Sequence, residues 1–338
     1  MNMIALLEKS IELKASDLHL STGMPPIVRI DGDLVRLENT TIVEDSWLKG
    51  ALAKIFPAER ITCLENDFSF TPCNATRCRV NIFQQSRGIS AAFRFIPHHV
   101  PTLDALMMPP ILKHLSLLKN GLILVTGSTG SGKTSTVAAM IQNINQHKAS
   151  HIIMMEDPIE YVYNSDKSLI QQREIHQHTN SFQSALRAAL REDPDVIVVG
   201  ELRDLETIRL ALTAAETGHL VFATLHTHSC ATSINRIIDV FPSEDKALVR
   251  NMLSESLQAI ISQTLVKKIG GGRIAAQEIM IGNPAIRHLI RENKTTQIMS
   301  VIQTNQANGM RTMEDSFKDL YVKKLIDHSS LLTLRSSS

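Results

Sequence analysis

Four apolar runs in the latter two thirds of the chain constrain its fold more than any other feature. They read LILVT (122–126), HIIMM (151–155), DVIVVG (195–200) and HLVFATLH (219–226), and none shows the polar alternation of a half-exposed strand. Strands of this kind are covered on both faces, which is typical of parallel sheets flanked by helices. The sequence therefore predicts an α/β domain with a mostly parallel sheet.

A glycine-rich loop, GSTGSGKT, follows the first of these runs and precedes the helical stretch TSTVAAMIQNI. It matches the pattern G-x-x-x-x-G-K-[ST], in which backbone amides surround phosphate oxygens at a helix amino terminus. The lysine of this pattern reaches the β- and γ-phosphates, and the hydroxyl residue binds Mg²⁺. The sequence thus predicts that ATP and Mg²⁺ bind at Gly127, Ser128, Thr129, Gly130, Ser131, Gly132, Lys133, Thr134 and Ser135.

Acidic residues follow two other apolar runs. Glu201 comes directly after DVIVVG, at the edge of the sheet where ligands bind in α/β domains. It can hold Mg²⁺ directly or through water, and the alternative is an acid that caps a helix. The stretch MMEDPIE (154–160) places Glu156, Asp157 and Glu160 around Pro158, which gives three further candidates for the site.

Residues 1–98 show a different pattern, and they are expected to form a small α+β domain. Asp31-Gly32 lies between alternating apolar residues and predicts a hairpin. A second hairpin is predicted around QSRG, with Arg77, Arg79 and Arg94 on one sheet face that is either merely solvated or functional. The proline-containing residues 99–110 are expected to be a linker, and residues 111–338 the second domain.

Composition and charge narrow the classes of function. Lys plus Arg number 35 against 34 for Asp plus Glu, so wholesale binding of nucleic acid is not expected. No stretch approaches the roughly 18 apolar residues of a membrane span, and a cytosolic location is expected. Cys63, Cys73, Cys78 and Cys230 form no C-x-x-C pair, which predicts buried or inert thiols.

Five motifs in one order resemble those of secretion ATPases. They are GSTGSGKT, MMEDPIE, LREDPDVIVVGELRDLET, TGHLVFATLHTHSCA and AIRHLIRE. The chain is most similar to the PilT-like retraction ATPases of type IV pili, and the resemblance covers nearly its whole length, including ASDLHLSTGMPPIVRIDGDL near the start. It implies an amino-terminal PAS-like domain and a RecA-like ATPase domain with a carboxyl-terminal helical part, assembled as a hexameric ring.

The resemblance also implies roles for single residues. Glu160 corresponds to the catalytic glutamate that polarises the attacking water, with Pro158 fixing the turn and Glu156 and Asp157 supporting it or the water shell of the metal. Glu201 corresponds to the acidic residue of the Walker B segment. Two histidines, His219 and His226, correspond to a pair that senses the γ-phosphate or the neighbouring domain, although strand histidines are more often satisfied polar core residues. The arginines that would reach a neighbour's nucleotide are Arg79 and Arg94.

The segment GNPAIRHLIREN (282–293) carries no plausible catalytic group. Asn283 and Pro284 predict a helix start, and Ile286, Leu289 and Ile290 form an apolar face. The opposite side carries a basic stripe that includes Arg287 and Arg291, and this stripe is either solvated or a contact surface. In PilT-like proteins this segment marks retraction motors, which implies a partner-binding role for Ala285, Ile286, Arg287, Leu289, Ile290, Arg291 and Glu292.

The predicted function is therefore an ATP-hydrolysing motor that drives pilus retraction at the inner-membrane base of the pilus. The implied partners are further copies of the chain, an inner-membrane platform protein and other pilus ATPases. The alternatives are a pilus-assembly or type II secretion ATPase, a PilU-like paralogue, a conjugation-type ATPase, and a nucleotide-dependent scaffold without turnover. Assembly ATPases are longer and usually carry a paired C-x-x-C insertion, which this chain lacks.

Overall fold

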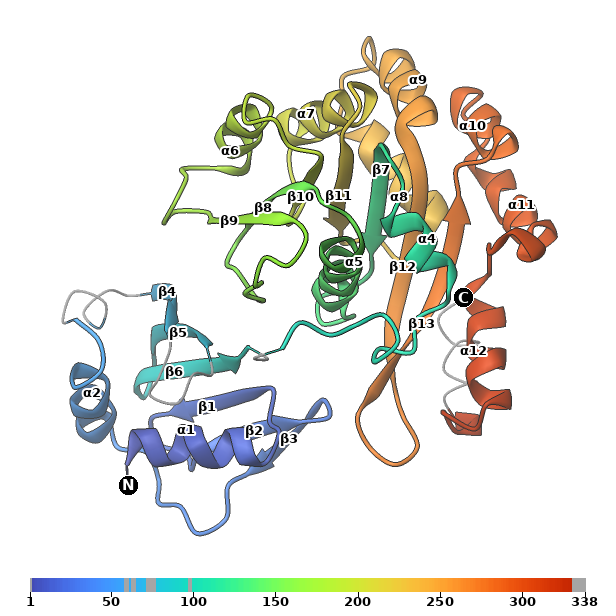
Figure 1. The fold of residues 1–338 in the computed structure, drawn as a ribbon. Coiled ribbons are helices and arrows are strands. Elements are labelled where there is room, and N and C mark those ends of the chain that lie inside the picture. Colours follow the sequence, from blue (N-terminus) through green and yellow to red (C-terminus); the bar gives the residue numbers. More distant parts are fainter. Residues whose placement is uncertain (1, 58–60, 62–64, 71–76, 97–98, 330–338) are drawn as a thin grey trace. The chain divides into compact units, whose positions relative to one another are not determined.

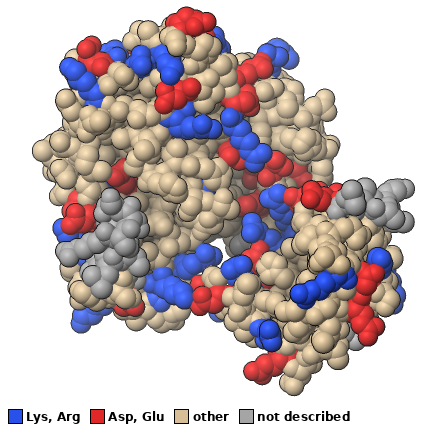
Figure 2. Space-filling model, turned by 180° about the vertical axis from the view of Figure 1, so that it is seen from behind, with Lys and Arg blue, Asp and Glu red and all other residues tan. Residues whose placement is uncertain are grey.

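The computed structural model describes residues 2–57, 61, 65–70, 77–96 and 99–329. The chain forms two compact units, Met1–His99 and Val100–Ser338, which are coloured blue to cyan and cyan to red in Figure 1. Each unit has its own buried core. On the face shown in Figure 2, acidic and basic side chains lie interspersed, which matches their near balance in the sequence.

The first unit is an antiparallel sheet with helices. Its strand order is β3-β2-β1-β6-β5-β4. The elements are α1 (Met3–Glu12), β1 (Asp17–Ser21), β2 (Ile27–Ile30), β3 (Asp33–Arg36), α2 (Asp45–Ala53), β4 (Glu65–Phe70), β5 (Cys78–Gln85) and β6 (Gly88–Phe95). Alternate strand residues such as Leu18, Val80 and Phe93 point into its core, together with Leu7 of α1.

Both predicted hairpins of this unit are confirmed. Asp31 and Gly32 join β2 to β3 with φ angles of 50° and 98°, which is the left-handed backbone of a type I′ turn. The second hairpin joins β5 to β6, and Arg79 of β5 lies directly opposite Arg94 of β6. Cross-strand partners share a sheet face, so the prediction is right for these two arginines.

The second unit contains a seven-stranded sheet in the order β13-β12-β7-β11-β10-β8-β9. Neighbouring strands run parallel from β12 to β9, and the edge strand β13 runs antiparallel to β12. Its strands are β7 (Gly121–Thr126), β8 (His151–Glu156), β9 (Leu169–Glu174), β10 (Val196–Val199), β11 (Leu220–Leu225), β12 (Leu257–Lys267) and β13 (Arg273–Ile281). The four apolar runs are the inner strands β7, β8, β10 and β11, which confirms the mostly parallel sheet.

Helices cover both faces of this sheet (Figure 1). They are α4 (Ile111–Ser116), α5 (Lys133–His147), α6 (Phe182–Ala189), α7 (Leu205–Glu216), α8 (Cys230–Asp239), α9 (Lys246–Ser256), α10 (Pro284–Arg291), α11 (Ile298–Thr304) and α12 (Met313–Val322). Along β7, Leu122 and Leu124 pack with α6 to α10, whereas Ile123 and Val125 pack with α4 and α5. Burial on both faces explains why the strand lacks polar alternation.

Most of the segment expected to be a linker packs on the second unit. The boundary between the units falls between His99 and Val100, and Leu103 is buried in the same cluster as α4 and α5. Leu106 and Met108 are half-buried against that cluster. Among the described residues, no helix is both long and apolar enough to cross a membrane.

Candidate active site

The motifs of the second unit meet at one edge of the sheet. Thr126, at the end of β7, pairs with Leu225 at the end of β11, and Val199 of β10 pairs with both Ala223 and Met155. The carboxyl ends of these parallel strands therefore lie side by side. The phosphate loop, Glu201, His226 and the loop that carries Glu160 all follow these ends, at the edge where α/β domains bind ligands.

The loop between β7 and α5 has the geometry of a phosphate cradle. Gly127 has a φ of 145°, and a Cβ atom there would lie 2.3 Å from the carbonyl oxygen of Gln263 and 2.5 Å from Ser131 Oγ. Only glycine fits this position. Ser131 Oγ is buried and has no hydrogen-bond partner among the described residues, so a polar group is available inside the loop. These features fit a phosphate group of a nucleotide.

Lys133 lies at the start of α5 with its amine turned into the loop. Its Nζ donates to the carbonyl oxygens of Gly127 and Ser128, at 2.9 Å each. Burial lowers the pKa of the Lys133 amine, and the carboxylates of Glu201 and Glu160 act in the opposite direction. The amine is therefore held where phosphate oxygens would bind, within electrostatic reach of both predicted acids.

The backbone at Glu201 is held in place by hydrogen bonds of the residues before and after it. The Gly200 amide donates to Met155 O at 2.8 Å, and the Leu202 amide donates to Thr224 O at 3.0 Å. The Glu201 carboxylate lies 3.1 Å from His226 Nε2 and accepts from Arg203 Nε at 2.8 Å.

A different acid caps the following helix. Asp204 accepts from the Thr207 amide at the start of α7, so the alternative role considered for Glu201, an acid that caps a helix, belongs to Asp204. Glu201 does not cap this helix and stays at the sheet edge, where Arg203 and His226 contact it. The structure also places His226 directly beside it.

Glu160 lies half-buried in the loop between β8 and β9, and both neighbouring residues are held. The Ile159 amide donates to Glu174 Oε2 at 3.2 Å, and Gln172 Nε2 donates to the Tyr161 carbonyl at 2.7 Å. The Tyr161 hydroxyl lies 2.8 Å from Ser135 Oγ, in the first turn of α5. These contacts fasten the Glu160 loop to the phosphate loop.

Sequence reasoning missed Gln172 and Glu174. Glu174 is only 2% exposed, although it is a carboxylate. The sequence signal that could have indicated them is the stretch LIQQRE, which forms β9 and carries polar residues next to the buried strand β8. Glu156 is also buried and accepts from Gln172 Nε2 at 3.0 Å, so it supports the loop, whereas Asp157 is exposed.

His219 does not reach the site of its own chain. It precedes β11 whereas His226 follows it, and six residues of strand separate the two by about 20 Å. Its Nδ1 lies 2.9 Å from the carbonyl oxygen of Ala214 near the end of α7. His219 therefore lies at the opposite edge of the sheet from the phosphate loop of its own chain. Its predicted role in sensing the γ-phosphate or the neighbouring domain stays a prediction.

Arg79 and Arg94 lie in the first unit and have acidic partners there. Arg79 pairs with Asp67 at 2.5 Å, and Arg94 pairs with Asp17 at 2.9 Å. Asp17 is mostly buried, whereas the Arg94 side chain is half exposed. The two guanidinium groups are thus oriented on one polar face of the sheet.

The segment 282–293 forms the predicted helix. Asn283 Oδ1 accepts from the Ile286 amide, Pro284 occupies the first turn, and the apolar face with Ile286, Leu289 and Ile290 is buried. The expectation of an exposed basic stripe is wrong for Arg287, which is half-buried.

Arg287 and Arg291 attach α10 to the end of α9. Arg287 donates to the carbonyl oxygens of Ser254 and Glu255, at 2.5 Å each, and to Gly282 O at 3.0 Å. Arg291 pairs with the Glu255 carboxylate at 2.9 Å. Positive charge at the carboxyl-terminal end of a helix is favourable, and the last carbonyl groups of α9 gain donors.

Within the part of the chain that the structure describes, no three His, Cys, Asp or Glu side chains converge to hold a metal. A Mg²⁺ ion held mainly by substrate phosphates, water and one or two protein oxygens still fits Thr134 and Glu201. Of the cysteines, Cys78 and Cys230 are buried, and burial raises the pKa of Cys78 to about 12. Cys63 and Cys73 lie outside the described residues.

Comparisons with known proteins agree with this geometry. Residues 73–272 match the family described as Type II/IV secretion system protein. The chain is 54% identical to the type IV pilus retractation ATPase PilT of Pseudomonas aeruginosa, over 98% of this chain and 97% of that protein. It is 34% identical to the type IV pilus ATPase PilU of the same organism, over 98% of this chain and 88% of that protein.

A solved structure shares the fold of the whole chain. It is a crystal structure of the pilus retraction motor PilT with bound ADP, which has 46% sequence identity and a TM-score of 0.87. The match covers 98% of this chain and 96% of that one. The chain is therefore more similar to retraction motors than to the PilU protein.

Proposed function

We infer that this chain, a member of the Type II/IV secretion system protein family, is a PilT-like ATPase that drives type IV pilus retraction. One observation carries the mechanism. The Lys133 amine lies inside the phosphate loop, within electrostatic reach of Glu160 and Glu201. A phosphate-binding cation and two acids at one sheet edge are the groups that ATP hydrolysis requires.

The proposed roles follow from these positions. The loop amides and Lys133 would bind the β- and γ-phosphates, and Thr134 and Glu201 would hold Mg²⁺, which would neutralise charge on the phosphate oxygens. Glu160 orients and polarises the attacking water. His226, which contacts Glu201, is the proposed sensor of the γ-phosphate.

The first unit is proposed to be a PAS-like domain that completes the site of a neighbour in a hexameric ring. Arg79 and Arg94 would supply positive charge to the neighbour's phosphates, as arginine fingers do. Their pairs with Asp67 and Asp17 orient them but must open for that contact. Loss of the γ-phosphate would then weaken the closed arrangement and turn hydrolysis into motion.

The ring predicts how turnover depends on concentration. Phosphate release per chain at saturating MgATP is expected to rise with protein concentration and then level off, because separate chains lack the neighbour's arginines. Excess EDTA is expected to stop it, because Thr134 and Glu201 act through Mg²⁺. A coupled phosphate assay over a dilution series measures both. Release at background level at every concentration would leave only the scaffold alternative, and a constant rate per chain down to concentrations at which the chain is monomeric would rule out trans arginines.

Retraction is proposed to require contact with an inner-membrane platform protein at the cytoplasmic base of the pilus, and with other pilus ATPases. No nucleic-acid partner is proposed. The surface of α10 is the proposed contact, and Arg287 and Arg291 hold it in place on α9. This leaves exposed positions such as Ala285, His288 and Glu292 for the partner.

Arg287→Ala is expected to stop retraction with ATPase activity near normal. Its loss leaves the Ser254 and Glu255 carbonyl groups without a donor, which should cost about 1–3 kcal/mol of stability and loosen α10. Thermal unfolding, phosphate release and twitching zones measure the three effects. The matched control is Lys294→Ala, an exposed cation three residues beyond α10. Normal twitching by the Arg287 variant would rule out this role.

A further inference from the structure

Two buried glutamines lie behind the phosphate loop and take no part in the mechanism above. Gln263 of β12 and Gln277 of β13 are cross-strand partners, and they are 3% and 1% exposed. A buried amide group costs stability unless its donors and acceptors are paired. Their contacts therefore show what these side chains hold in place.

Gln263 contacts the backbone of the phosphate loop. Its Nε2 donates to the Ser131 carbonyl at 2.7 Å, and its Oε1 accepts from Thr136 Oγ1 at 2.8 Å. A carbonyl oxygen can only accept, so the NH₂ end of Gln263 must face Ser131 and its oxygen must face Thr136. The orientation of the amide is thus fixed by its surroundings.

The bond to Ser131 also determines where the next amide points. In a planar trans peptide, the Ser131 carbonyl and the Gly132 N–H point in opposite directions. A carbonyl held toward β12 turns the Gly132 N–H away from β12, toward the side on which the loop binds phosphate. We propose that Gln263 is a positioning residue that presets the Gly132 amide for phosphate before nucleotide binds, and that Gln277 couples this setting to helix α12.

The second half of the proposal stands on the contacts of Gln277. Its Nε2 lies 3.4 Å from Gln263 Oε1, and its backbone amide donates to Ser316 Oγ of α12 at 2.8 Å. Because β13 is the edge strand, this amide faces away from β12 and needs a partner outside the sheet. Ile279 and Arg311 exchange backbone hydrogen bonds beside it. The start of α12 therefore docks along the free edge of β13.

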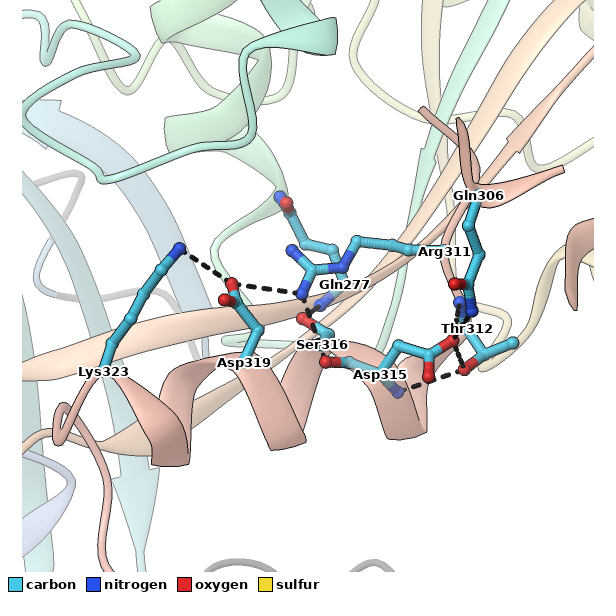
Figure 3. A network of polar contacts seen from close by, with 8 residues as sticks. All are labelled: Gln277, Gln306, Arg311, Thr312, Asp315, Ser316, Asp319 and Lys323. Atoms are coloured by element: carbon cyan, nitrogen blue, oxygen red, sulfur yellow. Dashed lines mark hydrogen bonds and ion pairs between the residues drawn. The ribbon is translucent and has the colours of Figure 1, made fainter. Parts of the chain in front are cut away.

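Figure 3 shows a network of polar contacts at this start of α12. Asp315 accepts from Thr312 Oγ1 at 2.6 Å and from Gln306 Nε2 at 2.7 Å. Asp319, one turn later, accepts from Arg311 and from Lys323. A movement of the loop at Ser131 would therefore be transmitted to α12 through the side-chain amides of Gln263 and Gln277.

Gln263→Glu tests the first half, which rests on nucleotide binding at the phosphate loop. The substitution keeps the shape but places a carboxylate oxygen against the Ser131 carbonyl. ADP affinity, measured by calorimetry, is expected to fall about tenfold, the effect of one buried hydrogen bond. Gln258→Glu, on the same strand at the other end of the sheet, is the control and should stay within about twofold of wild type.

Thr136→Val provides a milder variant that keeps the packing of α5. Thr136 is fully buried and cannot touch the nucleotide, yet its hydroxyl orients Gln263. ADP affinity is expected to fall about threefold. If wild type binds ADP and both variants bind it equally well, Gln263 does not position the loop. If wild type itself binds no ADP, the proposed function fails together with the inference.

Gln277→Leu tests the coupling to α12 by hydrogen exchange. ADP is expected to slow amide exchange in residues 313–322 of wild type at least about twofold. The variant leaves the pair of Gln263 and Thr136 intact, so it should bind ADP within about threefold of wild type but lose the response in α12. An unchanged response in the variant, or no response in wild type, would refute the coupling.

Discussion

Glu160→Gln is expected to lower the turnover number for MgATP by a factor of about 10²–10⁴, the usual contribution of a general base. The amide keeps the size of the side chain but cannot polarise water. ADP affinity should stay within about twofold of wild type, because the loop amides and Lys133 provide the phosphate contacts. Single-turnover phosphate release and calorimetry measure the two quantities separately.

The control is Asp157→Asn, which neutralises an exposed acid of the same loop and should leave turnover near normal. The hydrogen bonds to Ile159 and Tyr161 keep the loop folded in both variants, because they involve backbone atoms and the side chains of Gln172 and Glu174. If Glu160→Gln weakens ADP binding as much as it slows turnover, Glu160 contacts the nucleotide and the assignment to the attacking water is wrong.

Features that depend on local pattern could be predicted from the sequence. The apolar runs identified β7, β8, β10 and β11, because strands covered on both faces must be apolar throughout. The Asp31-Gly32 turn is equally local, because its backbone conformation depends on two residues. The edge at which the site lies followed from these strands, since the motifs come directly after their carboxyl ends.

Contacts between distant segments were not predictable in this way. Arg287 reads as an exposed cation on its own helix, and its partners at Ser254 and Glu255 are more than thirty positions away. Gln263 likewise reads as an isolated polar residue until β12 is paired next to the phosphate loop. The position of His219 did not depend on such contacts. His219 precedes β11 and His226 follows it, so the direction of the strand alone already places the two residues at opposite edges of the sheet.

Lys133→Ala is expected to lower ADP affinity at least about 100-fold and to reduce turnover to background. Each hydrogen bond from the amine to a phosphate is charge-assisted, and losing two costs about 3–6 kcal/mol. The apo chain should lose little stability, because removing an amine that is costly to bury offsets the donor that the buried Gly127 carbonyl group loses, and water can reach the exposed Ser128 carbonyl group.

Lys148→Ala is a matched control at the opposite end of α5. Its amine also donates to two backbone carbonyl groups, those of Leu117 and Leu118, but it lies away from the site. This variant should lose stability and keep ADP affinity, whereas Lys133→Ala should do the reverse. Calorimetry and thermal unfolding of both variants separate the two roles. Equal loss of ADP affinity in both would mean that α5 as a whole, rather than the Lys133 amine, determines nucleotide binding.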